Sequence, residues 1–188
     1  MNNKKAKIQN DYWTREFDFN FEHRVFFTII TNNYIIQITG GSVIILDKKT
    51  SIKIKQIKGY NYLYTGDVKP DESELFALEN GKHFYIISLT DYEQKRKVTL
   101  PRSYESIDVF GSFSRDGEFL YVPVYKFTDD QYKYWLCEYE TKSYSLVRMT
   151  EIDFSEVTSW HDYGEDCSFK QLRNRSEHMG VQKSEMIK

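Results

Sequence analysis

Four runs of residues between positions 25 and 57 decide the fold: VFFTII (25–30), YIIQI (34–38), SVIIL (42–46) and SIKIKQI (51–57). They are rich in β-branched and aromatic residues, and segments of three or four turn-forming residues separate them. This pattern is typical of antiparallel strands joined by tight turns. The first three runs are almost continuously apolar, which predicts that both of their faces are buried. In the fourth run Ile52 and Ile54 alternate with lysines, which predicts an edge strand with one solvated face.

The same unit of four runs recurs twice along the chain. The second copy comprises residues 60–64, 75–78, 84–89 and 97–100, and the third comprises residues 107–110, 119–122, 134–137 and 144–147. The sequence GDVKPDESELF (66–76) aligns with GSFSRDGEFLY (111–121) at an offset of 45 positions. A repeat of about this length with four strands per copy favours a repeated β architecture.

The segment FSRDGEFLY (113–121) resembles the Ser-x-Asp-Gly-x-x-Leu turn of TolB-like and WD-repeat-like β-propellers. The resemblance extends as repeats from about residue 25 to residue 149. It implies that the Asp-Gly turn joins the innermost strand of a blade to the second strand, and Gly117 is expected to adopt a positive φ there. The chain lacks the Trp-Asp and Gly-His pairs of WD repeats, so the resemblance indicates no subfamily.

We expect three parts in the chain: residues 1–24 with an extra strand, a repeated β-blade domain over 25–172, and a polar C-terminal tail over 173–188. A fourth unit is expected to open at Ile152, which gives an all-β partial propeller of about three and a half blades. Three explanations remain open for the incomplete count. The chain is a truncated relic of a larger propeller, two copies complete a ring, or the strands form a twisted open sheet or β-sandwich.

Composition excludes several classes of function. Lys and Arg number 26 against 28 Asp and Glu, so a nucleic-acid partner is not expected. The mean hydropathy of −0.64 argues against a membrane-spanning helix. Two cysteines, Cys137 and Cys167, behind an N-terminus without a secretory signal predict reduced thiols in a cytoplasmic protein.

The densest polar segment is the loop WHDYGEDC (160–167), which supplies five residues able to bind a metal: His161, Asp162, Glu165, Asp166 and Cys167. Their spacing matches no zinc or calcium motif. Cys137 lies inside an expected strand, which predicts a buried, inert thiol. No nucleophile elbow, phosphate loop or dinucleotide motif is present in the sequence. We therefore expect no catalytic residue, no metal and no cofactor, with an enzyme acting through this loop as the alternative.

The expected function is a non-enzymatic interaction or scaffold module. Its partner would be another protein, or a second copy that meets the open edge left by Phe154, Val157 and Trp160. Aromatic residues also suggest a recognition surface, because tyrosines alternate along two expected strands and one face of each should be exposed. These are Tyr60, Tyr62, Tyr64, Tyr132 and Tyr134.

Overall fold

The computed structural model describes residues 5–9, 14–18, 25–107 and 111–152, and the side chains of residues 25, 27–107 and 111–152. These residues form strands and turns and no helix. The first sheet contains β1 (Lys5–Gln9), β2 (Thr14–Asp18), β3 (Val25–Ile30), β4 (Tyr34–Thr39), β5 (Ser42–Asp47) and β6 (Lys53–Lys58). The second contains β7 (Leu63–Val68), β8 (Glu74–Glu79), β9 (His83–Ser88) and β10 (Gln94–Thr99). The third contains β11 (Glu105–Ser106), β12 (Ser112–Phe113), β13 (Phe119–Thr128), β14 (Gln131–Glu140) and β15 (Ser145–Ile152).

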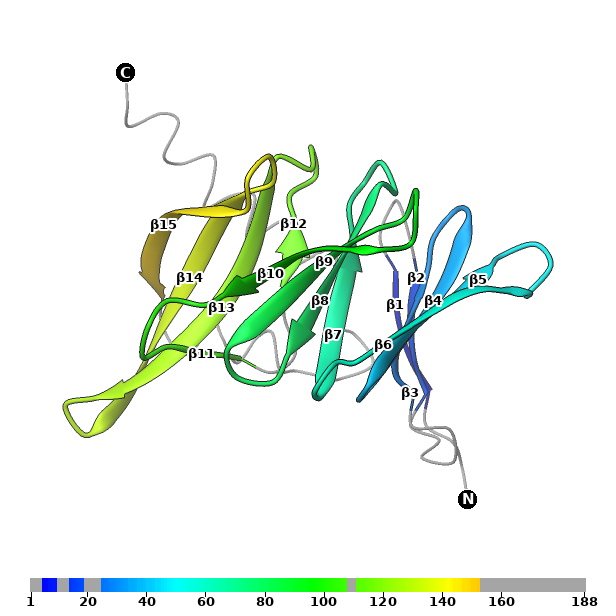
Figure 1. Ribbon diagram of the computed structural model, residues 1–188. Coiled ribbons are helices and arrows are strands. Elements are labelled where there is room, and N and C mark those ends of the chain that lie inside the picture. The colour runs from blue at the N-terminus through cyan, green and yellow to red at the C-terminus, as the bar shows by residue number, and fades with distance from the viewer. Residues whose placement is uncertain (1–4, 10–13, 19–24, 108–110, 153–188) are drawn as a thin grey trace.

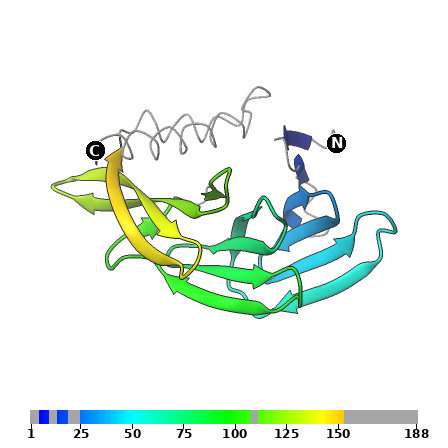
Figure 2. The same cartoon turned by 90° about the horizontal axis from the view of Figure 1, so that it is seen from above.

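Every strand pairing is antiparallel, and consecutive strands are neighbours in the first two sheets. In the third sheet β11 and β12 both pair with β13, which then pairs with β14. The three sheets, called blades 1, 2 and 3, follow one another along an arc (Figure 2). Within the described residues the arc does not close into a ring. The first strand of blade 2, β7, contacts both β3 and β12 (Figure 1). This is the stacking of successive propeller blades, so the expected architecture is confirmed.

Two apolar layers hold the blades together. The layer between blades 1 and 2 brings Ile36 and Ile45 together with Leu75 and Tyr85. The layer between blades 2 and 3 joins Phe76 and Phe84 to Leu120, Val122 and Tyr139. Residues next to each other along β8 face opposite layers, because side chains alternate across a strand. Blade 2 is therefore buried on both faces.

Close approach between blades depends on two glycines that are 45 positions apart. A Cβ on Gly66 would lie 2.5 Å from the carbonyl oxygen of Phe76 and 2.6 Å from Cδ1 of Ile38 in blade 1. A Cβ on Gly111 would lie 2.5 Å from the ring of Phe76 in blade 2. Each glycine thus leaves room for a side chain of the preceding blade. The internal alignment of these two segments has a physical basis.

Several strand predictions were wrong in detail. The first strand of blade 2 is β7 at 63–68 and not residues 60–64, since Gly66 and Asp67 serve packing here and do not form a turn. Only one face of β4 and β5 is fully buried, because blade 1 packs on blade 2 from one side. The alternation of Ile52 with lysine was expected to mark the buried face of the fourth strand, but the Ile52 side chain is 66% exposed. Ile152 is the last residue of β15 and so belongs to blade 3; the rest of the expected fourth unit lies outside the described residues.

The extra strand expected near the N-terminus is present as β2, which pairs with β3. A further strand, β1, was not expected and pairs with β2. The third blade begins with two short strands, β11 and β12, which lie on either side of the strand expected at 107–110. Residues 108–110 lie outside the described part of the chain.

Candidate functional site

The turn that joins the last two strands of a blade is called its outer turn. The outer turns of blades 2 and 3 each direct a tyrosine toward the preceding blade. Tyr144, in the turn between β14 and β15, has a φ of 55° and is 5% exposed. Its hydroxyl donates to Oε2 of Glu74, the first residue of β8, over 2.7 Å. Burial, followed by this bond, raises the pKa of Tyr144 above its ordinary value. Lys69 Nζ lies 3.4 Å from the same carboxylate oxygen. The contact joins blade 3 to blade 2.

Tyr92 occupies the corresponding position in the turn between β9 and β10, with a φ of 58°. Its ring meets that of Tyr34, the first residue of β4, edge to face at a centroid distance of 6.3 Å. The hydroxyl of Tyr34 donates to the carbonyl of Leu89. The hydrogen bond with Tyr92, followed by burial, raises the pKa of Tyr34 to about 12. In blade 1 the corresponding position is Ser51, which is exposed and has a φ of 57°.

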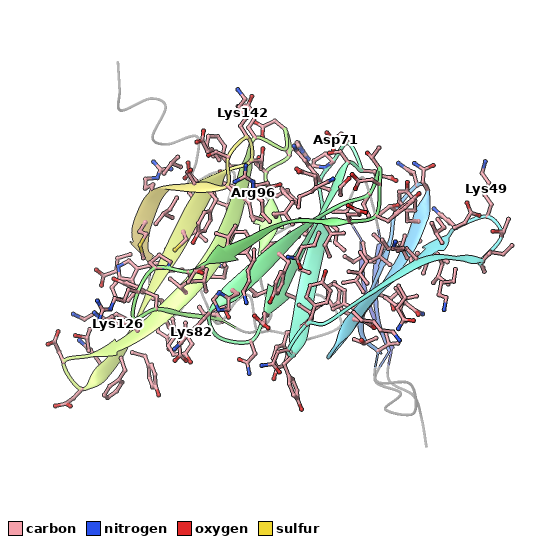
Figure 3. All side chains as sticks on the ribbon, in the orientation of Figure 1. Lys49, Asp71, Lys82, Arg96, Lys126 and Lys142 are labelled. Carbon is pink, nitrogen blue, oxygen red and sulfur yellow. The ribbon has the colours of Figure 1, made fainter. Side chains whose placement is uncertain are left out.

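A surface pocket of about 670 Å³ lies at blade 3, and Phe119 is one of its lining residues. Phe119 is the first residue of β13, as Tyr34 and Glu74 are of β4 and β8. Most of the wall comes from two places in blade 3: the turn between β12 and β13, and the β14–β15 hairpin including its turn. Lys69 and Asp71 complete the wall from the turn between β7 and β8. We call this feature the third-blade pocket. Figure 3 shows Asp71 and Lys142, two of its lining residues, at the same end of the molecule.

The described lining residues carry five carboxylates and three cationic groups. The carboxylates belong to Asp71, Asp116, Glu118, Glu138 and Glu140, and the cations to Lys69, Lys142 and Arg148. Glu138 is paired with Arg148. Val147, which is 50% exposed, and the half-buried Phe119 supply the larger apolar surfaces. Most of the lining residues are therefore charged, with a slight excess of negative charge, although apolar atoms supply the larger share of the exposed lining.

Two of these carboxylates hold their own turns in place. Asp71 accepts from the amide and the hydroxyl of Ser73 at 2.9 and 2.6 Å. Burial alone would raise the pKa of Asp71, but the two bonds from Ser73 outweigh it and the pKa is lowered. Asp116 accepts from Ser114 Oγ and from the amide of Glu118. Within the described residues no group of three or more His, Cys, Asp or Glu side chains is arranged to bind a metal.

Other sites considered from sequence fall into two groups. The metal-binding candidates His161, Asp162, Glu165, Asp166 and Cys167 all lie outside the described residues. Cys137 lies fully buried in β14, which confirms the predicted burial, and burial raises the pKa of its thiol to about 12. In the part of the chain that is described, no helix is long and apolar enough to span a membrane.

The proposed tyrosine face is only partly present. Tyr60 is buried at 8% exposure against Tyr85, with ring centroids 4.7 Å apart, because residues 60–62 precede β7 and do not extend it. Tyr62 and Tyr132 are each more than half exposed. Tyr132 lies near the tip of the long β13–β14 hairpin, whose turn contains two residues of positive φ, Asp129 and Asp130. Sequence reasoning missed the third-blade pocket, although the shared turn position of Tyr92 and Tyr144 was a signal for the contacts beside it.

Comparison with known proteins shows the fold. No protein-family model matches the sequence, and no curated protein sequence matches it. The structure resembles the β-propeller domain of Myceliophteria thermophila Cps50 (Swd1), with a TM-score of 0.55 and 10% identity over 80% of this chain and 59% of that one. It also resembles the WD40 repeats of RRP9, with a TM-score of 0.50 and 15% identity over 63% of this chain and 35% of that one. Kuenenia stuttgartiensis hydrazine synthase gives a TM-score of 0.54 and 15% identity over 77% of this chain and 44% of that one. The chain spans only part of each of these proteins, and its likeness to the propeller domain and the WD40 repeats shows the β-propeller fold.

Proposed function

We propose that this protein is a non-enzymatic module that binds another protein, and that the third-blade pocket is its contact site. The observation that carries the proposal is the pocket of about 670 Å³, bordered by charged side chains from three turns on a scaffold of stacked sheets. Binding residues are frequently carried on turns that a rigid scaffold holds in place.

The chemistry of the wall favours a protein partner over the other classes of ligand. Small-molecule sites are lined mostly by apolar and aromatic side chains, whereas Phe119 and Val147 are the two larger apolar side chains among the described lining residues. Five carboxylates against three cations disfavour a nucleic-acid backbone, since phosphate groups require a basic surface. A polar peptide surface with both charges fits such a wall.

Similarity of fold gives the proposal no functional support of its own. The solved structures that resemble this chain include both WD40 repeats and a hydrazine synthase. Likeness in fold therefore extends to proteins of different function. The proposal depends on the pocket and on its lining residues.

The test is affinity purification of the tagged full chain from its native extract, with quantitative mass spectrometry of the proteins retained. Lys142→Glu reverses a charge at the pocket, and Lys82→Glu is the matched control, an exposed lysine at the opposite end of the molecule (Figure 3). We expect partners retained by the wild type and by Lys82→Glu to be lost with Lys142→Glu. Equal retention by all three forms would contradict the pocket as the contact site, and no specific retention would contradict the proposed function.

The competing hypothesis is an enzyme that uses a metal bound by the 160–167 loop. Metal analysis of the purified protein separates the two hypotheses. We expect less than stoichiometric zinc, manganese or iron. A stoichiometric metal that is lost from His161→Ala would contradict a non-enzymatic module.

A further inference from the structure

The third-blade pocket stands at one of three equivalent positions in the blades. The first residues of β4, β8 and β13 are Tyr34, Glu74 and Phe119. A tyrosine from the outer turn of the next blade contacts the first two of these residues: Tyr92 meets Tyr34, and Tyr144 binds Glu74. Phe119 lines the pocket. Two members of the series are thus already filled by tyrosines of this chain.

The surroundings of the second and third positions also match. Asp71 and Asp116 each precede the first strand residue by three positions, and each accepts a hydrogen bond of 2.9 Å from the amide two residues later. Arg96 and Arg148 each follow the turn tyrosine of their own blade by four positions. Arg96 acts electrostatically on the hydroxyl of Tyr144, and Arg148 lines the pocket. The third position therefore keeps the carboxylate and the cation that surround Tyr144 at the second.

The residue at the centre of the third position is suited to an aromatic ring. Phe119 can meet an incoming ring edge to face, as Tyr34 meets Tyr92. Glu140 pairs with Phe119 across the β13–β14 ladder and also lines the pocket. A carboxylate beside the ring can accept a hydrogen bond from a phenol, as Glu74 does from Tyr144.

We propose that the third-blade pocket binds the tyrosine of a β-turn presented by a partner protein, in the manner in which blade 2 binds Tyr144. This rests on the proposed function and specifies the chemistry of the partner. A second copy that continued the stack with its own blade 1 would bring Ser51 to the pocket, so the partner is a different protein. Tyr121 and Leu136 in blade 3 are already buried, and the proposal concerns only the pocket.

The test uses ¹⁵N-labelled full-length protein titrated with a synthetic peptide of the sequence ETKSYSLV, which is the 140–147 turn of this chain. The control peptide carries alanine in place of the tyrosine. We expect saturable chemical-shift changes at the amides of Phe119, Thr141 and Val147, with a dissociation constant on the order of 1 mM for one buried aromatic side chain. At the same concentration, the alanine peptide should cause chemical-shift changes at least tenfold smaller. No saturable change, or equal changes with both peptides, would overturn the inference.

Two protein variants locate the binding. Val147→Glu places a charge in the pocket at an exposed position, and Leu146→Glu is the matched control, since Leu146 is 40% exposed and does not line the pocket. Val147→Glu should abolish the shift changes and Leu146→Glu should retain them. Equal binding by both variants would overturn the inference. So would self-association of the wild type that Val147→Glu abolishes, because a second copy would then occupy the pocket. If partner retention depends on Lys142 while the peptide fails to bind, this inference is wrong and the proposed function stands.

Discussion

Replacement of Gly66 by alanine tests the packing of blade 2 on blade 1. The new Cβ would lie 2.5 Å from the Phe76 carbonyl oxygen and 2.6 Å from Cδ1 of Ile38, whereas ordinary contacts begin at 3.4 Å. The Ile38 side chain can rotate, but the Phe76 oxygen belongs to the backbone of β8, which pairs with β7. The strands must separate to relieve this contact. Overpacking of this kind costs about 1–3 kcal/mol.

Gly41→Ala is the matched control. A Cβ at Gly41 would have its nearest neighbour, the Tyr60 carbonyl oxygen, at 3.7 Å. Because alanine causes no clash here, its main effect is to lower the conformational entropy of the unfolded chain. Such a change stabilises the folded protein by about 0.4–1 kcal/mol. The two substitutions change the same chemical group, so their difference isolates the close approach at Gly66.

The assay is urea denaturation followed by far-UV circular dichroism. With a slope of about 1–3 kcal/mol per molar urea, a loss of 1–3 kcal/mol moves the midpoint by about 1 M. We expect Gly66→Ala to unfold at lower urea and Gly41→Ala to unfold at or slightly above the wild-type midpoint. Equal midpoints for the two variants would refute the packing of β7 between β8 and blade 1.

Three further predictions concern stability. Glu72→Ala should destabilise by about 1–3 kcal/mol in the same urea assay, since the Glu72 carboxylate accepts from Thr31, Asn32 and Asn33 of blade 1; a change below 0.5 kcal/mol, on the order of a neutral surface substitution, would contradict this bridge. Gly117→Val should destabilise by about 1 kcal/mol or more, because the φ of Gly117 is 73° and a β-branched residue is poorly tolerated there. A variant with the wild-type urea midpoint would contradict the positive φ assigned to the Asp116-Gly117 turn. Burial raises the pKa of Cys137 to about 12 from its usual 9.0, so the stability that this group contributes is complete below about pH 9 and falls at higher pH, when the unfolded thiol ionises first. Urea midpoints between pH 8 and pH 10.5 check this, and Cys137→Ala should lessen the decline.

The strands that the sequence predicted correctly are those with a strong apolar pattern. The runs at 25–30, 34–38 and 42–46 became β3, β4 and β5 because β-branched residues lie between clear turn formers. The Asp116-Gly117 turn was also predictable, since φ is positive at Gly117 as expected. Local sequence determines these features.

Features that depend on contacts between blades could not be predicted. Gly66 and Asp67 have the local preferences of a turn, yet both lie in β7. Asp67 is fully buried and accepts from the amide of Phe113 in blade 3 over 2.8 Å. Glu72 likewise depends on a contact between blades. Its φ is 56°, and its carboxylate holds the β3–β4 turn of blade 1.

The third-blade pocket was beyond prediction because its wall combines turns that are distant in sequence. Lys69 and Asp71 come from blade 2, whereas Phe119 and Arg148 come from separate strands of blade 3. Within its own segment, each of these charged residues looks like any residue of a solvent-exposed turn. Only the stacking of the two blades brings them together.

Ring-to-ring nuclear Overhauser effects test most directly the central claim that the sheets stack as propeller blades. Phe84 of blade 2 and Tyr139 of blade 3 have ring centroids 5.1 Å apart, and Tyr34 and Tyr92 join blades 1 and 2 at 6.3 Å. The pair Phe76 and Phe84, at 5.4 Å within blade 2, is the internal control. We predict cross-peaks for all three pairs. A cross-peak for the control pair with none for the two pairs between blades would contradict the stacking.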